Sequence, residues 1–256
     1  MSNRNSTHYP LGLIGEIFGR LWALWGLVWF VVTMIIFLIP FFSAGYFLPE
    51  PTRTKRFISF SRVWMAVFLN LIRCPLTIRG REHFRPGETY IVVCNHNSLM
   101  DVPITSPGIP GGNKTIAKIE MAKVPVFGLL YKTGSVLVDR KSDASRRESF
   151  VRMKEVLDMG LHMCIYPEGT RNKTDQPLKS FHDGAFRLAV NTQKSMIPAV
   201  IFGSKRAFPP SKSFFLWPAK LSMHFLAPID VLATDNIQEL KEKVFAIMKD
   251  YYLANQ

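Results

Sequence analysis

The stretch Tyr90-Ile-Val-Val-Cys94 is followed directly by Asn95-His-Asn-Ser-Leu-Met-Asp101. The first five residues are apolar, which is typical of a short strand buried inside a sheet. The next seven are mostly polar, and Pro103 just beyond them suits the first turn of a helix. In open α/β sheets, ligands bind beyond the carboxyl ends of the strands. This junction therefore predicts both the fold class and the place of a functional site.

The chain on either side repeats this alternation of short apolar runs and amphipathic segments. Ser145-x-x-Glu148 is a capping-box pattern that predicts a helix start, and Gly160 is expected to end that helix. Residues 107–112 are rich in Gly and Pro and predict a flexible loop. Strands separated by helices predict an α/β domain with a mixed, mainly parallel sheet flanked by helices. The predicted strands are 90–94, 115–118, 135–138, 162–166, 197–202 and 221–226, and the other predicted helices are 184–192 and 236–253.

The N-terminal part of the chain is apolar, and residues 21–49 contain no formally charged side chain. As one helix these residues would be about 43 Å long, against a bilayer core of about 30 Å. Pro40 and Pro49-Glu-Pro51 are expected to break the helix. The second apolar stretch, 57–72, is interrupted by Arg62 and leaves too short a run to span a bilayer. These features predict a membrane-embedded helical hairpin that folds back into one leaflet.

Three tryptophans, Trp22, Trp25 and Trp29, share one face of the predicted first helix. They could anchor the helix at the membrane interface or simply pack against a neighbouring element. Basic residues flank the second apolar stretch, so the positive-inside rule predicts a cytoplasmic domain after it, in a bacterium at the inner membrane. These basic side chains are also expected to meet anionic headgroups. They are Arg53, Lys55, Arg56, Arg62 and Arg73.

The formal net charge is +13, from 32 Lys and Arg against 19 Asp and Glu, and residues 1–49 contribute only +1 of it. We therefore divide the chain into a membrane-associated segment, 1–74, and a basic α/β domain, 75–256. The charge admits acidic proteins, anionic lipids, phosphorylated metabolites and nucleic acids as partners. The chain has three cysteines, Cys74, Cys94 and Cys164, and the odd count argues against a disulfide framework. We expect buried thiols in a reducing compartment.

His96 and Asp101 form the first candidate catalytic pair. A spacing of five residues puts them on different faces of an ideal helix, so they can meet only if the chain turns after the strand and then begins a helix. A carboxylate bonded to one ring nitrogen would leave the other as a general base. The alternative is a structural histidine bonded to a capping aspartate. Ser98 and Cys94 could act as nucleophiles, but a turn hydroxyl and a buried strand thiol explain them better.

Cationic and turn-forming residues follow the other predicted strands. Lys118 and Arg140 each come just after a strand, and Glu168-Gly-Thr-Arg171 follows another through a proline. Gly169 allows close approach of the backbone to a ligand, and Thr170 and Arg171 suit phosphate oxygens. A plain β-turn with an exposed arginine is the alternative. The histidines and cysteines lack metal-ligand spacing, and we predict no metal and no cofactor.

Taken together, these residues resemble the motifs of the membrane glycerolipid acyltransferases. Asn95-His96-x4-Asp101 resembles their first motif, and Glu168-Gly-Thr-Arg171 looks like the third. Gly134–Arg140 looks like the second, and Ile197–Val200 is similar to the fourth, with Ala199 where valine is common. Lys118-Ile-Glu120 and Pro125–Gly128 are similar to the segment between the first two motifs in the 1-acylglycerol-3-phosphate acyltransferases.

The resemblance implies transfer of a fatty acyl chain from acyl carrier protein or coenzyme A to the free hydroxyl of 1-acylglycerol 3-phosphate, giving phosphatidate. It assigns His96 as the base and Asp101 as its orienter. It implies that Lys118, Arg140 and Arg171 bind phosphate and that the residues from Glu168 to Thr170 shape the acceptor site. His182-Asp183 stands where a lysine is often found in the family, so the acceptor headgroup could differ from plain lysophosphatidate.

Other functions remain open at this level. An acyltransferase acting on a lyso-amino-acid lipid, such as an ornithine or glycine lipid, would share the His/Asp chemistry. A thioesterase or phospholipase would use Ser98 or Cys94 covalently. A basic peripheral membrane-binding module would need no catalysis. Nucleic acid is not expected as a partner, because the sequence has no helix-turn-helix signature, zinc finger or aromatic-basic interleaving.

Overall fold

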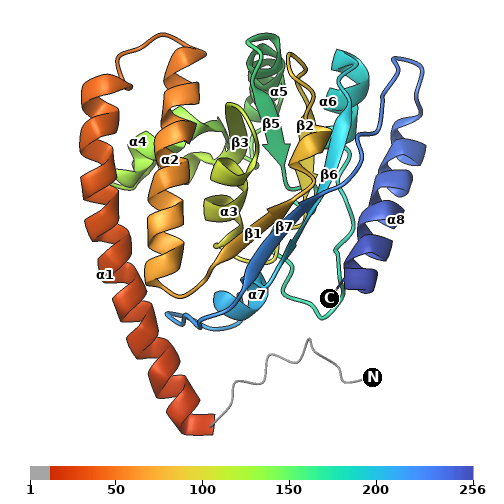
Figure 1. Cartoon of the computed structure of the whole chain (residues 1–256). Helices are drawn as coiled ribbons and strands as arrows, with labels where there is room; N and C mark the ends of the chain where they lie inside the picture. Colours follow the sequence, from red (N-terminus) through yellow and green to blue (C-terminus); the bar gives the residue numbers. More distant parts are fainter. Residues whose placement is uncertain (1–11, 256) are drawn as a thin grey trace.

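A computed structural model describes residues 12–255 of the chain (Figure 1). The first eleven residues of the predicted membrane segment and Gln256 lie outside the described residues. Within residues 12–255, seven strands form one sheet in the order β1-β7-β6-β2-β5-β3-β4. All neighbours are parallel except β6 and β7. The strands are β1 (Leu76–Arg79), β2 (Ile91–Cys94), β3 (Asn113–Lys118), β4 (Ser135–Val138), β5 (His162–Ile165), β6 (Met196–Phe202) and β7 (Leu221–Phe225).

Helices cover both faces of this sheet, so the prediction of a mixed, mainly parallel sheet flanked by helices is confirmed. The N-terminal helices and α3 lie against one face, and α5, α6 and α8 lie against the other (Figure 1). The α-helices are α1 (Gly12–Ala44), α2 (Thr52–Leu71), α3 (Asp101–Gly108), α4 (Phe127–Gly134), α5 (Asp143–Asp158), α6 (Gly184–Thr192), α7 (Ser204–Ala207) and α8 (Ile237–Asn255), and two short 3-10 helices span Arg81–His83 and Ile119–Lys123.

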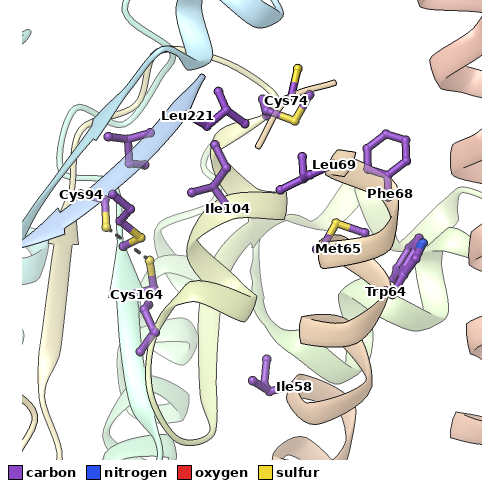
Figure 2. Packing of buried hydrophobic residues seen from close by; sticks show 14 of the residues in the cluster. Ile58, Trp64, Met65, Phe68, Leu69, Cys74, Cys94, Ile104, Cys164 and Leu221 are labelled. Carbon is purple, nitrogen blue, oxygen red and sulfur yellow. Dashed lines mark hydrogen bonds between the residues drawn. The ribbon is translucent and has the colours of Figure 1, made fainter. Parts of the chain in front are cut away.

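Strand β2 explains why its sequence is apolar throughout. Val92 and Cys94 point into the core on the side of the N-terminal helices, whereas Ile91 and Val93 point into the core beneath α6 and α8. Side chains alternate between the two faces of a strand, and both faces are covered here. Figure 2 shows the first of these cores, where Met65 on α2 lies on the side that faces α3.

Helices α1 and α2 form an antiparallel hairpin, as predicted (Figure 1). Helix α1 is long and apolar enough to cross a membrane, and many of its large hydrophobic side chains are exposed. Pro40 lies inside α1, so the expected break at that position is wrong. Proline removes one backbone hydrogen bond, and the helix continues for about one more turn, where Phe41 is buried in the core.

Hydrogen bonds join the two helices of the hairpin to each other, and the Leu216 amide of the α/β domain donates to the Gly19 carbonyl of α1 at 3.0 Å. The Trp22 and Trp25 indoles donate to the carbonyls of Ile72 and Leu71 at the end of α2, at 3.1 Å each. These two indole N–H groups therefore serve packing within the hairpin, because they satisfy carbonyls that a helix end leaves open. A methyl group on Gly19 would lie 2.1 Å from the Phe215 ring, so glycine is needed where the segment that contains Phe215 crosses α1.

Arg62 corrects another expectation. Instead of meeting lipid headgroups, its guanidinium turns inward and donates to the carbonyls of Pro107, Ile109 and Gly111 at 3.0, 2.7 and 2.6 Å. Those carbonyls lie at the end of α3 and in the following turn, where helix carbonyls have no partner within the helix. Arg62 therefore ties α2 to α3. Pro107 and Gly108 belong to α3, so only residues 109–112 of the predicted 107–112 loop lie outside the helix.

Two local predictions differ in detail. The N-cap of α5 is Ser142, whose hydroxyl accepts from the Ser145 amide at 3.2 Å, so the capping box is not the one predicted at Ser145 and Glu148. Strand β1 was not predicted at all. Its four residues alternate between half-buried and exposed, and its pairing with β7 depends on a partner about 145 residues away in sequence.

Candidate active site

Four neighbouring strands bring the predicted site residues to one edge of the sheet. β2, β5, β3 and β4 are adjacent and parallel, so their carboxyl ends point the same way. His96 follows β2, the 168–171 turn follows β5, Lys118 ends β3, and Arg140 follows β4. An imidazole, two carboxylates and several cations therefore lie along a single edge, where α/β sheets usually bind ligands.

His96 and Asp101 are in direct contact. His96 Nδ1 lies 2.9 Å from Asp101 Oδ2, which also accepts from the backbone amides of Asn97 and Ser98 at 2.6 and 2.7 Å. The chain turns after β2, and α3 begins at Asp101 itself. An ionised carboxylate only accepts hydrogen bonds, so Nδ1 holds the ring proton and Nε2 is free to accept another. Asp101 is fully buried, whereas the His96 side chain is 17% exposed.

The other two candidate nucleophiles are in structural positions. The Ser98 hydroxyl donates to the Phe208 carbonyl at 2.7 Å and accepts from the Met100 amide at 3.1 Å, and Ser98 is fully buried. Cys94 lies inside β2 with its sulfur 3.9 Å from that of Cys164 on β5. Burial raises the pKa of the Cys94 thiol well above its usual value, so it stays protonated. These surroundings leave His96 as the accessible reactive group of the loop.

Glu168, which follows the neighbouring strand β5, forms hydrogen bonds that hold the loop containing His96. One carboxylate oxygen accepts from the His96 amide at 2.7 Å, and the other accepts from the Lys179 amide at 2.9 Å. Burial raises the pKa of Glu168 to about 7, although these two amide hydrogen bonds oppose the rise. The Asn172 amide donates to the His96 carbonyl at 2.6 Å. Both backbone groups of His96 are thus held by the segment that follows β5.

The cations of the site fall into two groups. Arg140 donates to the Gly169 carbonyl, and partial desolvation lowers the pKa of its guanidinium while the Glu120 carboxylate raises it. Lys118 and Arg171 form no hydrogen bond or ion pair with any other residue between 12 and 255. Their charges are therefore available to an anionic ligand. Gly169 has a φ of +68°, which favours glycine at this turn.

Three residues near His96 were missed at the sequence level. Tyr166 stacks on the His96 ring, Lys179 donates its side-chain ammonium to Thr170 Oγ1 at 2.8 Å, and Asn172 holds the His96 carbonyl. The only sequence signal for Tyr166 is an aromatic residue at the end of a predicted strand beside Pro167 and Glu168. No sequence signal indicates Lys179, because it lies in a loop eleven residues after Glu168.

An apolar cavity of about 410 Å³ lies between the hairpin and the α/β domain. Leu99 and Met100, which follow His96 in the same loop, form part of its wall. The volume falls within the usual range of small-molecule sites. Such a lining suits a hydrocarbon chain. Other wall residues are Gly26 and Phe30 of α1, Trp64 and Phe68 of α2, Phe127 and Leu130 of α4, and Phe208 and Leu216.

Comparisons with known proteins agree with this arrangement. A family model described as Acyltransferase matches residues 75–202. A 1-acyl-sn-glycerol-3-phosphate acyltransferase of Cocos nucifera is 30% identical over 214 residues, which cover 82% of this chain and 68% of that protein. The alpha form of the enzyme from Mus musculus is 31% identical over 172 residues, 65% of this chain and 60% of that protein. A relative of the same name from Helicobacter pylori is 33% identical over 119 residues, 46% of this chain and 50% of that protein.

Among solved structures, the fold is similar to the crystal structure of the 1-acyl-sn-glycerophosphate acyltransferase PlsC from Thermotoga maritima. The TM-score is 0.77 at 22% identity, and the match covers 94% of this chain and 98% of that one. This likeness includes the N-terminal hairpin as well as the sheet, because so little of either chain is left out.

Proposed function

Because this chain belongs to the acyltransferase family, we propose that it transfers a fatty acyl chain from a thioester donor to the free hydroxyl of 1-acylglycerol 3-phosphate, giving phosphatidate. The observation that supports this most directly is the His96–Asp101 pair at 2.9 Å in the same loop that forms part of the wall of the apolar cavity. The names of the relatives support the choice of acceptor.

The chemistry follows from the hydrogen bonds of His96. The acceptor hydroxyl gives its proton to His96 Nε2 as its oxygen attacks the thioester carbonyl, and Asp101 stabilises the imidazolium that forms. The tetrahedral intermediate then collapses, the C–S bond breaks, and the leaving thiolate takes the proton from Nε2. The acyl group passes directly from thioester to alcohol, since both candidate nucleophiles near His96, Ser98 and Cys94, are fully buried.

The cations at the edge of the sheet would bind the acceptor phosphate. Lys118 and Arg171 are unpaired among the described residues, and Arg140 fixes the Gly169 carbonyl beside them. Arginine and lysine are the usual phosphate partners, arginine in a bidentate manner. Glu168 contributes by shaping the turn, because both its oxygens already accept from backbone amides. Thr170 would add a hydroxyl at the rim.

The hairpin would place this site at the surface of a membrane. We propose that α1 and α2 lie in one leaflet and that residues 75–256 form the catalytic domain on the cytoplasmic face, the inner membrane in a bacterium. The exposed hydrophobic side chains of α1 support insertion. The donor would be acyl carrier protein or coenzyme A, both of them acidic and thus suited to a domain with a formal net charge of +8, from 25 Lys and Arg against 17 Asp and Glu in residues 75–256.

The test is an acyl-transfer assay with the full chain in mixed detergent micelles. Lysophosphatidate and a lyso-ornithine lipid are compared as acceptors, each with acyl carrier protein and coenzyme A thioesters. We expect transfer to lysophosphatidate, and a loss of about 10²- to 10⁴-fold in His96→Ala. His224→Gln is the matched control, because this histidine pairs with Tyr251 away from the site and its loss should leave the rate unchanged. Wild-type turnover in His96→Ala contradicts the mechanism, and preference for the lyso-ornithine lipid contradicts the acceptor.

A further inference from the structure

The ring of Tyr166 covers one face of the His96 imidazole. Tyr166 comes directly after β5, and its ring centroid lies 4.3 Å from that of His96 with 25° between the planes. The Tyr166 hydroxyl and Thr105 Oγ1 are 2.6 Å apart, within hydrogen-bond distance. Thr105 belongs to α3, four residues after Asp101. Residues four apart lie on the same side of a helix.

Two residues on the same side of α3 therefore help to hold the His96 imidazole in place. Asp101 holds the edge of the imidazole through Nδ1, and Thr105 holds the tyrosine that covers its face. A single hydrogen bond to Nδ1 fixes one edge but leaves the ring free to tilt about that bond. Glu168 and Asn172 bind only the backbone of His96. The stack is the contact that restricts the tilt.

We propose that Tyr166 is a positioning residue for acyl transfer, whose stacked ring fixes the plane of the His96 imidazole and stabilises the imidazolium formed when the acceptor hydroxyl is deprotonated. This inference rests on the proposed function. The face of an aromatic ring attracts a cation, and the attraction is stronger where water is excluded. The stack therefore favours the protonated ring as well as its orientation.

The groups around the stack are consistent with this role. Burial raises the pKa of the Tyr166 hydroxyl well above its usual value, so the residue stays a neutral ring and hydrogen-bonding partner. Asp101 at the ring edge supplies the counter-charge, and the Glu168 carboxylate lies against the backbone instead of the ring. The titratable groups on the neighbouring elements are Asp101 of α3, Cys94 at the end of β2, Cys164 of β5, Glu168 in the turn, and Tyr252 of α8. Burial and the carboxylates of Asp101 and Glu168 raise the pKa of Tyr252, so it stays neutral.

The experiment separates the ring from the hydroxyl, using the full chain in the same micellar assay. Tyr166→Leu removes the stacked face. We expect kcat to fall about 10- to 100-fold at an unchanged KM for lysophosphatidate, because misorientation of a base costs this much. The acidic limb of the kcat/KM profile should move to lower pH by about half a unit, since the protonated ring loses its support. If Tyr166→Leu does not fold, Tyr166→Met, which can adapt to the vacated space, replaces it.

Tyr166→Phe and Thr105→Val test the hydroxyl link. Each removes the same hydrogen bond while keeping the ring, so each should lower kcat by no more than about threefold, and the double variant should be no worse than either single one. The pH profile should stay where it is in wild type. A loss in Tyr166→Phe as large as that in Tyr166→Leu would overturn the role of the ring.

Tyr90→Leu is the matched control for loss of a stacked tyrosine. Tyr90 stacks on the ring of His162 at 5.8 Å and 27°, at the start of β5 and away from His96. We expect a lower Tm with kcat and the pH profile unchanged. Wild-type kcat and an unshifted profile in Tyr166→Leu overturn the proposal for Tyr166 while the acyltransferase function stands. Full activity in His96→Ala would instead remove the function on which the inference rests.

Discussion

Two histidines lie at opposite edges of the sheet, and both are stacked on a tyrosine. His96 follows the carboxyl end of β2, and His162 begins the neighbouring parallel strand β5 at its amino end. The His96–Tyr166 rings are 4.3 Å apart at 25°, and the His162–Tyr90 rings are 5.8 Å apart at 27°. A histidine–tyrosine stack therefore does not make a catalytic site by itself.

The two rings differ in what Nδ1 meets. His162 Nδ1 accepts from the Tyr90 backbone amide at 3.0 Å, so this nitrogen has no proton and the ring is held in its neutral form. Burial lowers the pKa of His162 to about 4. His96 Nδ1 instead faces the Asp101 carboxylate, which stabilises a positive ring. His96 can act as a base because the partner of its Nδ1 is a hydrogen-bond acceptor. His162 has a structural role because the partner of its Nδ1 is a hydrogen-bond donor.

The largest effect on kcat should come from replacing the charged partner of His96 with a neutral one, so that its surroundings become more like those of His162. Asp101→Asn removes the counter-charge. The amide oxygen of asparagine can replace Oδ2 as the acceptor of the three hydrogen bonds, because Oδ1 has no partner among the described residues, but a neutral amide no longer supports His96 as a cation. We expect kcat to fall about 10³- to 10⁴-fold with the fold retained. The assay is acyl transfer to lysophosphatidate, with Tm measured alongside.

Asp235→Asn is the control for that variant. Asp235 accepts from the Leu232 amide in a surface turn, so its loss should leave kcat unchanged. Should Asp101→Asn retain more than a tenth of the wild-type kcat, a carboxylate partner would not be what distinguishes the two histidines.

The second prediction addresses the structural histidine. Between about pH 6.5 and pH 4 the unfolded chain binds a proton at His162 that the folded chain excludes, so the free energy of unfolding falls as the pH is lowered through this window. The His162 contribution is about 3 kcal/mol. His162→Asn can still accept from the Tyr90 amide but does not titrate, so its stability should fall less steeply.

Denaturant unfolding of the full chain in detergent, measured from pH 8 to pH 4, checks this. Transfer at neutral pH should remain within about twofold of wild type, because His162 lies at the far edge of the sheet. Parallel stability curves for wild type and His162→Asn would show that this ring is not held neutral.

Glu168 has the opposite dependence on pH and a smaller expected effect. Its pKa is about 7 in the folded chain against 4.5 in the unfolded one, so its contribution to stability is lost as the pH rises through this range. In Glu168→Gln that loss should disappear. One of the two backbone amides then faces an N–H₂ group, which should cost about 1–3 kcal/mol and lower kcat about tenfold through movement of His96.

The matched variant is Glu88→Gln at the amino edge, where the carboxylate accepts from the Tyr90 hydroxyl and forms an exposed ion pair with Arg85. We expect unchanged kcat and a small change in stability. An equal loss of kcat in the two variants would mean that Glu168 acts through general stability and not through the His96 backbone.

Much of the sheet could be predicted from sequence because its signals are local. The apolar runs of β2 to β6 and the 184–192 helix are visible without knowledge of their partners. The approach of His96 and Asp101 could also be predicted, since a strand followed by a helix start leaves little choice of turn. By contrast, the continuation of α1 through Pro40 depends on the packing of that helix, which the general rule that proline breaks helices does not take into account.

The parts that were missed depend on distant partners. Arg62 appears in sequence as a charge beside the membrane, but it binds carbonyls more than forty residues away. Tyr166 and Thr105 are separated by 61 residues and meet only because β5 lies next to β2 and α3 follows it. No pattern within either segment indicates such a contact. The support of a catalytic residue is therefore harder to predict than the residue itself.

The smallest predicted effect is that of removing the hydroxyl of Tyr90, and it can be compared directly with the effect of the same change at Tyr166. The Tyr90 hydroxyl donates to Glu88 at 2.6 Å, and burial together with that carboxylate raises the pKa of Tyr90, so it stays protonated. Tyr90→Phe keeps the stack on His162 and loses two hydrogen bonds, the one donated to Glu88 and the one accepted from the Arg85 amide, which should cost about 1–2 kcal/mol and leave kcat unchanged. Tm and kcat are measured beside those of Tyr166→Phe. A change in kcat for Tyr90→Phe would mean that the amino edge communicates with the site, because nothing in the contacts of Tyr90 reaches His96 directly.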